Sequence, residues 1–381
     1  MKNDLGLYIH IPFCVKKCDY CDFLSAPESE EEKKKYVEGL IKEIRSYKSF
    51  AENYKVSTIF VGGGTPSSLE SGMIRDIFQA VYDTFTCERR PEITIEMNPG
   101  TVTKEKLEVY KECGINRLSI GLQSVKNSNL KALGRIHTYE EFLETYHMAR
   151  ETGFRNINVD LISSIPDQTV ESWKEELETV AALSPEHISV YQLILEEGTP
   201  FFERYDEHPE LLPDEETSRE IYLTTGRILK EHGYQQYEIS NYAKEGRESR
   251  HNLKYWERKD YLGLGLGAAS MIRNIRMSNT GDKEVYMEKC ANPKTMRENV
   301  EFLEESKQME EFMFLGLRKT WGVSRKEFRN QFGRDLDLVY EKALAKFLEN
   351  GLLKEKKDRI FLSEEGVLVS NAVLSEFLFD K

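Results

Sequence analysis

Three cysteines near the start of the chain have the clearest capacity for chemistry. Cys14, Cys18 and Cys21 follow the spacing C-x-x-x-C-x-x-C and fall within eight residues. A structural zinc site usually takes four ligands from two separated pairs, and a redox dithiol needs only two cysteines. An iron–sulfur cubane normally takes four thiolates, so three would leave one iron open to another ligand. The spacing favours an iron–sulfur cluster, with zinc, a redox pair and unrelated cysteines as the alternatives.

A run of glycines is the second feature with chemical meaning. Residues 62–66 read Gly-Gly-Gly-Thr-Pro and directly follow a predicted strand. Glycine has no side chain and accepts positive φ, so such a run lets the backbone approach a neighbour closely. A plain tight turn uses the same residues, so the run alone does not identify a site.

Acidic and amide side chains fall close to the ends of three further predicted strands. Glu96 and Asn98 lie at the end of one strand, Gln123 follows the next, and Asp160 lies within the one after. Carboxylates bind cationic groups and hydroxyls, yet each residue alone also fits a helix cap or a local ion pair. A site is predicted here if the fold brings these strand ends together.

The first half of the chain alternates short β-rich segments with helical ones. The expected strands are short, β-branched and bounded by turn residues, and cover residues 5–11, 57–61, 92–97, 117–121, 157–162 and 187–193. The expected helices lie near residues 29–49, 69–83, 103–113, 138–152 and 169–183. Strands and helices that alternate in this way predict parallel strands with right-handed crossovers.

Six such units predict a partial (β/α)6 barrel as the core of an α/β protein. Functional residues of such barrels lie on the loops that follow the carboxyl ends of the strands. The cysteines, the glycine run and the polar residues named above all fall at those ends, so we expect them to share one site.

Three domains are predicted. The barrel core covers residues 1–195, an extension with a strand at 237–240 covers residues 196–299, and a smaller α+β, winged-helix-like domain covers residues 300–381. Residues 301–381 contain 14 basic and 16 acidic side chains. A winged helix that reads DNA is normally basic, so this domain is expected to have a structural or lid role.

The composition excludes several classes of protein. The 381 residues contain 53 Lys and Arg against 66 Asp and Glu, a formal net charge of −13. This acidic balance argues against general nucleic-acid binding, and no apolar run approaches the about 18 residues of a membrane span. Residues 5–11 lack the cleavage site of a signal peptide. We expect the protein to be cytoplasmic. A different class of function stays open as an alternative, namely a structural zinc protein that binds nucleic acid through its winged helix.

The cysteine motif on the first βα loop resembles the signature of the radical S-adenosylmethionine (SAM) enzymes. The resemblance implies a [4Fe-4S] cluster held by Cys14, Cys18 and Cys21, with SAM chelating the remaining iron through its amino and carboxylate groups. Reduction of such a cluster cleaves SAM to a 5′-deoxyadenosyl radical. The glycine run, with Gly63 and Gly64, resembles the motif that contacts the amino group of SAM.

Further motifs narrow the resemblance to the family of oxygen-independent coproporphyrinogen III oxidase. They lie at residues 8–14, 62–66, 96–99, 121–124 and 158–162, and the resemblance covers nearly the whole chain. It implies that a SAM pocket is lined by Tyr8, Gly64, Thr65, Glu96, Gln123, Arg135 and Asp160. Carboxylates suit the ribose hydroxyls and cationic groups of SAM, and arginine suits its carboxylate.

Two features point to the HemW branch of that family, described as haem chaperones. The oxidase typically carries a further cysteine two residues after the third, where this chain has Phe23. Residues 251–256, His-Asn-Leu-Lys-Tyr-Trp, match the H-N-x-x-Y-W hallmark of the branch. A neutral His251 can ligate haem iron, and Tyr255 and Trp256 can pack on the macrocycle. On chemistry alone, such residues more often serve ordinary packing.

The resemblance implies a haem chaperone that binds a [4Fe-4S] cluster, SAM and haem, and delivers haem to a respiratory acceptor protein. The expected partners are haem, that acceptor and a reductant for the cluster. Peripheral contact between this protein and membrane proteins is also expected. The alternative is a radical SAM decarboxylase of the coproporphyrinogen III oxidase type.

Overall fold

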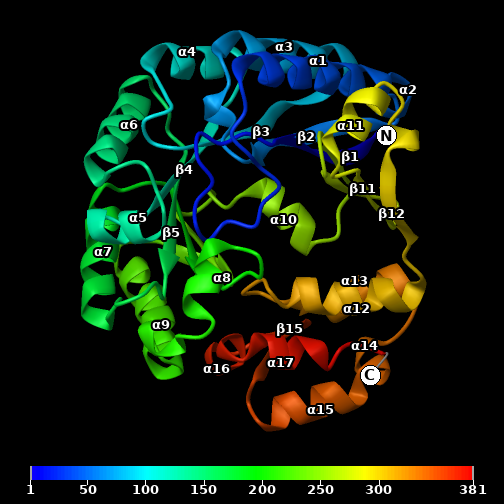
Figure 1. The fold of residues 1–381 in the computed structure, drawn as a ribbon. Coiled ribbons are helices and arrows are strands. Elements are labelled where there is room, and N and C mark those ends of the chain that lie inside the picture. Colours follow the sequence, from blue (N-terminus) through cyan, green and yellow to red (C-terminus); the bar gives the residue numbers. More distant parts are fainter. Residues whose placement is uncertain (1, 380–381) are drawn as a thin grey trace.

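Six parallel strands in sequence order form the centre of the structure, a computed structural model that describes residues 2–379. They are β1 (Asn3–Ile11), β2 (Tyr54–Gly63), β3 (Cys87–Met97), β4 (Arg117–Gln123), β5 (Ile157–Ser163) and β6 (His187–Gln192). The connecting helices cover the outside of this curved sheet (Figure 1) and are α1 (Glu30–Ser46), α2 (Lys48–Ala51), α3 (Ser71–Thr84), α4 (Lys104–Glu112), α5 (Asn127–Ala132), α6 (Tyr139–Glu151) and α7 (Val170–Ala182). The prediction of an α/β fold built on a partial (β/α)6 barrel is confirmed.

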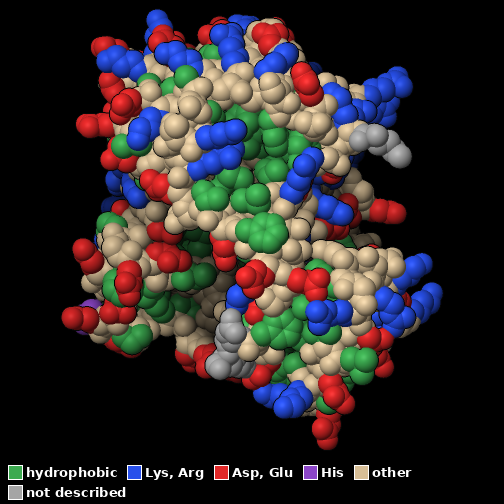
Figure 2. All heavy atoms as spheres, turned by 90° about the vertical axis from the view of Figure 1, so that its right-hand side faces the viewer, with side chains coloured by type: hydrophobic (Ala, Val, Ile, Leu, Met, Phe, Trp, Pro, Cys, Tyr) green, Lys and Arg blue, Asp and Glu red, His purple; other side chains and the backbone are tan. Residues whose placement is uncertain are grey.

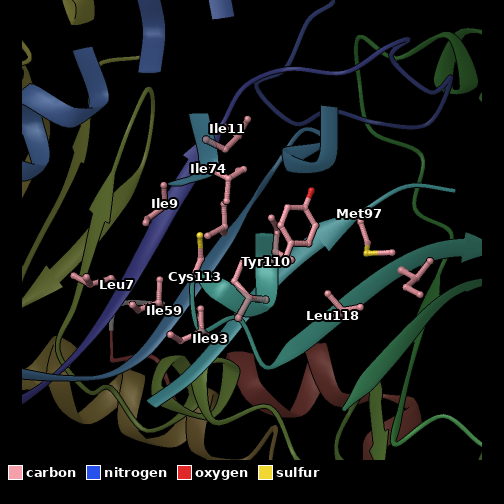
Figure 3. Packing of buried hydrophobic residues seen from close by; sticks show 14 of the residues in the cluster. Leu7, Ile9, Ile11, Ile59, Ile74, Ile93, Met97, Tyr110, Cys113 and Leu118 are labelled. Atoms are coloured by element: carbon pink, nitrogen blue, oxygen red, sulfur yellow. The ribbon is translucent and has the colours of Figure 1, made fainter. Parts of the chain in front are cut away.

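Side chains along the six strands point alternately outward, beneath the helices, and inward, into the barrel. The outward rows are apolar and fully buried, as Leu7, Ile59 and Ile93 illustrate (Figure 3). They pack with helix residues such as Ile74 and Tyr110 to form the main hydrophobic core. Buried apolar surface contributes about 25 cal/mol per Å², so this layer is the main source of stability.

Many positions of the inward rows are polar although their side chains are buried. Thr58, Arg117, Asn158 and His187 are at most 2% exposed. Asn158 Nδ2 donates to Ser119 Oγ at 2.7 Å, and His187 Nδ1 lies 2.6 Å from Asn158 Oδ1. Buried polar groups are normally hydrogen-bonded, and Thr58, Asn158 and His187 have such partners, whereas Arg117 Nε has none among residues 2–379.

Local sequence signals explain where the outer helices begin and end. The Thr138 hydroxyl caps α6 by accepting from Glu141 N–H, and the Glu141 carboxylate accepts from Thr138 N–H, which completes a capping box. The chain leaves this helix at Gly153, where φ is +96° and glycine is favoured. Such turns fix where each following strand starts and therefore how the strand ends align.

The sheet continues beyond the parallel strands at both edges. β9 (Tyr261–Leu264) pairs in parallel with β1, whereas β8 (Asn241–Ala243) pairs antiparallel with β6. The outer strands are β7 (Gln235–Glu238), β10 (Ala269–Ile272), β11 (Ile275–Asn279) and β12 (Arg297–Phe302). The complete order is β12-β11-β10-β9-β1-β2-β3-β4-β5-β6-β8-β7. The single strand predicted at 237–240 is thus wrong in extent, because the chain forms two short antiparallel strands there.

Four helices accompany these outer strands. They are α8 (Pro200–Tyr205), α9 (Glu215–Glu231), α10 (Arg250–Trp256) and α11 (Lys283–Lys289). Three short 3₁₀ segments cover Pro66–Ser68, Pro209–Leu211 and Pro293–Thr295. Helix α10 contains the whole H-N-x-x-Y-W motif and packs against β2 of the barrel and α12 of the C-terminal part.

The C-terminal part is a small α+β unit with its own hydrophobic cluster. Its elements are α12 (Glu305–Gly316), β13 (Val323–Ser324), α13 (Arg325–Phe332), α14 (Leu336–Val339), α15 (Glu341–Glu349), β14 (Leu353–Lys356), β15 (Arg359–Leu362), α16 (Glu364–Leu368) and α17 (Ser370–Ser375). The strands form an antiparallel sheet in the order β13-β15-β14, and the unit lies below the barrel in Figure 1. The predicted small α+β domain is confirmed, while the boundaries at residues 195 and 299 stay predictions.

A buried ion pair joins this unit to the rest of the molecule. The carboxylate of Glu311, on α12, accepts from Arg258 Nε at 2.8 Å and from Arg276 Nη2 at 2.5 Å. The side chains of Glu311 and Arg258 are only 5% and 3% exposed. The contact therefore fixes α12 against the segment that follows α10 and against β11.

Within residues 2–379, no helix is both long and apolar enough to cross a membrane.

Candidate functional site

The carboxyl ends of the parallel strands surround a cavity of about 330 Å³. All predicted site residues except Tyr8 and His251 line it: Cys14, Cys18, Cys21, Gly63, Gly64, Thr65, Glu96, Gln123, Arg135 and Asp160. Residues far apart in the sequence meet because parallel strands present their carboxyl ends at one rim. The arrangement is that of a single binding site.

The three cysteines lie on the loop between β1 and α1 and face the cavity with half-buried side chains. Backbone bonds hold the start of this loop against the glycine run. Gly64 N–H donates to Ile11 O at 2.8 Å, and Thr65 N–H donates to Phe13 O at 2.6 Å. The Thr65 hydroxyl also donates to Cys14 Sγ at 3.6 Å. These bonds position the first thiol beside the glycine run.

A cation lies beside the thiols. Arg135 Nη1 donates to Cys18 Sγ at 3.4 Å, and Arg135 Nε is buried with no hydrogen-bond partner among residues 2–379. The guanidinium therefore places positive charge beside the thiols. The Arg135 Nε–H is therefore free to donate a hydrogen bond to a bound ligand.

The three thiols that line the cavity are a donor set suited to an iron–sulfur cluster. No three His, Cys, Asp or Glu side chains in the described part of the chain converge as a single ion would require. In a cubane each thiolate binds a different iron atom, so the three sulfurs need not meet at one point. The donor set thus fits a [4Fe-4S] cluster.

Close packing explains the glycine run. Gly63 has φ +112°, and a Cβ there would lie 2.5 Å from the His10 ring. A Cβ on Gly64 would lie 2.5 Å from the carbonyl oxygen of Phe13 and 2.9 Å from its backbone nitrogen. The run therefore brings the backbone directly against the cysteine loop, where Gly63 N–H donates to Glu96 Oε2 at 3.1 Å.

Gly64→Ala is expected to displace the cysteine loop, because the added methyl group meets backbone atoms that cannot rotate away. We expect a loss of about 1–3 kcal/mol in the free energy of unfolding and a lower iron and sulfide content after reconstitution. Gly72→Ala is the matched control, since a Cβ at that helical position meets nothing within 4 Å. Full cluster content in Gly64→Ala would contradict the prediction.

Two carboxyl groups face the cavity from β3 and β5, the strands on either side of β4. Burial, together with the charge of Asp160, raises the pKa of Glu96 to about 8. Burial also raises the pKa of Asp160, although Asn158 Nδ2 donates to it at 2.8 Å and Ser119 Oγ donates at 3.0 Å. Two acidic groups in one buried site favour a ligand that brings positive charge or hydroxyl donors.

Asn98 also lines the cavity. The sequence placed it at the end of a strand but did not indicate what it does. Its Oδ1 accepts from Arg135 Nη2 at 2.8 Å, and its Nδ2 donates to Thr65 Oγ1 at 2.9 Å. Arg135 also donates to Gly121 O at 2.9 Å. Asn98 therefore connects the arginine beside the thiols to the glycine run. In the sequence, only its position after a predicted strand pointed to a place in the site.

Other residues also line the cavity but were not predicted from the sequence. Tyr20, Ser119, Tyr191 and Gln192 line the cavity, and all but Tyr20 lie on β4 or β6. Gln123, which the sequence did predict, has φ +73° at an irregularity in the β4–β5 pairing. Such irregularities redirect a side chain at the end of a strand.

Tyr8 lies beneath the cavity and does not line it. Its hydroxyl is 2.9 Å from His10 Nδ1, and His10 Nε2 is 3.0 Å from Leu24 O on the cysteine loop. The Tyr8 ring stacks on Phe60 with centroids 6.4 Å apart. In this structure Tyr8 supports the loop through His10, and contact between Tyr8 and a ligand stays a prediction.

His251 lies deeper in the barrel, near the amino ends of the strands. It is 1% exposed, its Nδ1 is 2.8 Å from Thr58 Oγ1, and its Nε2 is 2.8 Å from Tyr255 OH. Burial and the charges of Lys254 and Arg117 lower the pKa of His251 to about 3. Both ring nitrogens are engaged, so ligation of haem iron by His251 would require the ring to leave one of its partners.

Known proteins resemble this chain along nearly its whole length. A model of the radical SAM superfamily matches residues 8–180, and a model of the HemN C-terminal domain matches residues 303–369. The protein named heme chaperone HemW of Bacillus subtilis is 36% identical over 97% of this chain and 98% of its own length. The protein of that name in Escherichia coli is 36% identical over 98% of each chain. A mitochondrial protein of Mus musculus, radical S-adenosyl methionine domain-containing protein 1, is 32% identical over 98% of this chain and 87% of its own.

One solved structure resembles the whole fold. Coproporphyrinogen III oxidase (HemN) from Escherichia coli, described as a radical SAM enzyme, superposes with a TM-score of 0.88. The match covers 99% of this chain and 91% of the other at 24% sequence identity. At this identity the likeness establishes the fold, including the barrel and the C-terminal unit.

Proposed function

Because the chain belongs to the HemW family of the radical SAM superfamily, we propose that it is a haem chaperone that also binds a [4Fe-4S] cluster and SAM. The observation that carries the proposal is the shared cavity, in which three thiols, a buried arginine and two carboxyl groups meet at the strand ends. The expected destination of the haem is a respiratory acceptor protein.

The residues of the cavity divide between the two cofactors. Cys14, Cys18 and Cys21 would hold the cluster, and the glycine run, Glu96 and Asp160 would hold SAM beside it. When bound, the cluster supplies the electron that can cleave SAM. The protein's own contribution is to fix the thiols, to provide Arg135 as a counter-charge and to surround the site with barrel walls that limit access of water.

The position of the additional oxidase cysteine argues for a chaperone and against an oxidase. Phe23 occupies that position, is 60% exposed and lines the same cavity. An aromatic ring cannot supply a ligand or a proton there. Conversion of coproporphyrinogen III by the reconstituted protein would overturn the chaperone proposal in favour of an oxidase-type decarboxylase.

The test is a haem titration of anaerobically reconstituted protein, followed by the Soret band, with transfer of the bound haem to a respiratory haem protein as the second stage. We expect saturable, stoichiometric binding and transfer. A protein that binds no haem would contradict the proposal. Metal analysis that finds zinc without iron or sulfide would instead support the zinc-protein alternative.

His251→Ala in the same titration tests the predicted iron ligand. If His251 ligates the iron, the variant should bind haem more weakly and with a changed Soret band. If the hydrogen bonds to Thr58 and Tyr255 are its only role, the variant should be less stable while its haem affinity stays that of the wild type. The two readouts separate ligation from packing.

SAM affinity is expected to increase with pH. A carboxyl group with a pKa of about 8 is mostly protonated at pH 7 in the free site, so pairing Glu96 with the positive charge of the SAM sulfonium requires loss of a proton. Affinity should therefore rise between pH 6 and pH 8 by up to about tenfold per pH unit and level off above. Calorimetry across this range measures it. Glu96→Gln should flatten the profile, and a flat wild-type profile would show that Glu96 pairs with no cation.

A further inference from the structure

A second cavity lies on another face of the molecule, away from the cysteines. It measures about 400 Å³ and opens between the end of α1, helix α2 and the β10–β11 hairpin. Its walls are mainly apolar and include Phe50, Leu262, Ile272, Ile275 and Met277. Figure 2 shows hydrophobic side chains gathered on the face that carries these elements, with Lys and Arg side chains around them.

The cations of this cavity lack acidic neighbours in its lining. Lys294 and Arg297 line it, whereas no Asp or Glu of the described chain does so. Arg297 Nη2 donates to the hydroxyl of Tyr47 at 3.2 Å. The nearby carboxyl of Glu43 is fully buried and accepts from Gly265 N–H at 2.8 Å. In a protein of net charge −13, a positive, carboxylate-free cavity attracts an anion.

A third cavity has similar side chains, but its cations are already paired with carboxylates. It lies between α10 and the C-terminal unit, measures about 390 Å³ and is also lined by aromatic and basic side chains. Its cations are compensated: Arg359 Nη2 lies 3.0 Å from Glu327 Oε1, and Lys319 Nζ lies 3.9 Å from Glu257 Oε1. An anionic ligand there would compete with carboxylates that are already in place.

We propose that the cavity between α2 and the β10–β11 hairpin is the haem site, with Lys294 and Arg297 binding the two propionates. The proposal rests on the haem-chaperone function. Haem is a flat apolar ring with two carboxylates at one edge, and apolar walls with two cations that have no carboxylate partner in the lining match that pattern. The Met277 thioether and the Tyr47 phenol belong to the ligand types that hold haem iron in other proteins.

The location also suits a carrier. The opening faces solvent and is separate from the cysteine cavity, so haem could enter and leave without passing the cluster. The β12 strand beside it exposes Val300 by 61% and Phe302 by 66%. His251, in contrast, is fully buried with both ring nitrogens bonded.

The experiment is a haem titration of the reconstituted full-length protein in which three variants are compared with the wild type. Lys294→Gln/Arg297→Gln removes both propionate partners, and Ile275→Trp fills the cavity. Lys342→Gln/Lys354→Gln removes the same charge from exposed positions of the C-terminal unit. Iron and sulfide content and circular dichroism establish that each variant is folded and carries its cluster.

We expect the Lys294/Arg297 variant to bind haem at least about tenfold more weakly, Ile275→Trp to lose most binding, and the control to match the wild type. Unchanged affinity in both cavity variants would overturn the proposed site while leaving the chaperone function standing. Equal losses in the control and the Lys294/Arg297 variant would also overturn it, because net charge would then explain the effect. A wild-type protein without haem affinity would instead refute the chaperone function itself.

Discussion

Cys18→Ala is expected to abolish the cluster and leave the barrel folded. The loss should be essentially complete, because three thiolates are already one fewer than a cubane normally takes. The fold should survive because Cys18 lies on a loop outside the regular elements and its side chain is only half-buried. Iron and sulfide analysis with the visible spectrum measures the first effect, and circular dichroism measures the second.

Cys87→Ala is the matched control for this variant. Cys87 is also a free, half-buried cysteine, but it lies at the start of β3, away from the cavity. It should retain full iron and sulfide content. Unfolding of Cys18→Ala at room temperature would contradict the expectation, since it would mean that the cluster holds the barrel together.

Glu311→Ala is expected to destabilise the protein by about 3–5 kcal/mol, the largest stability effect predicted for a single side chain here. The substitution leaves Arg258, which is almost fully buried, without its carboxylate, and removes the partner of Arg276 as well. A buried charge without a partner is costly because it has lost its hydration. Chemical denaturation, monitored separately for the barrel and the C-terminal unit, measures the loss.

Glu305→Ala provides the comparison on the same helix. Glu305 pairs with Arg334 at 3.0 Å, but both side chains are more than half exposed. Exposed pairs contribute at most about 1 kcal/mol, so this variant should unfold almost like the wild type. Equal effects of the two substitutions would show that the Glu311 pair does not anchor α12.

The barrel and its cavity were predictable because their signals are local and repetitive. Each of the six parallel strands is short and rich in β-branched residues, and four of the outer helices, α1, α4, α6 and α7, begin at a side-chain cap. Once the strands are parallel, their carboxyl ends must share a rim, which brings Cys14, Glu96 and Asp160 together without knowledge of any long-range contact. A few short sequence motifs were therefore enough to predict many of the residues that line the cysteine cavity.

The edges of the sheet were not predictable in the same way. β9 to β12 have only four to six residues each, and their pairing depends on β9 joining β1 from more than two hundred positions away. The strand β12 is mostly exposed and lacks the alternating pattern of a half-buried strand. The haem cavity proposed above has one wall built from these elements, so no sequence motif indicated it.

The surroundings of His251 depended on tertiary structure as well. The H-N-x-x-Y-W pattern predicts that its residues act together, and they do, since Tyr255 accepts or donates a hydrogen bond at His251 Nε2. What the pattern does not reveal is that α10 presents His251 to Thr58 inside the barrel. A motif specifies neighbours along a helix, whereas burial depends on what the helix packs against.

The polar interior of the barrel divides the strands into two classes of position with different tolerance to substitution. An outward Leu7 or Ile59 sits among hydrocarbons, where a side chain of similar volume can take its place at modest cost. An inward Asn158 or His187 has partners at fixed distances and directions, and no apolar side chain of equal size restores them. Variation among functional sequences should therefore alternate with a period of two along each strand, with the freer positions beneath the helices.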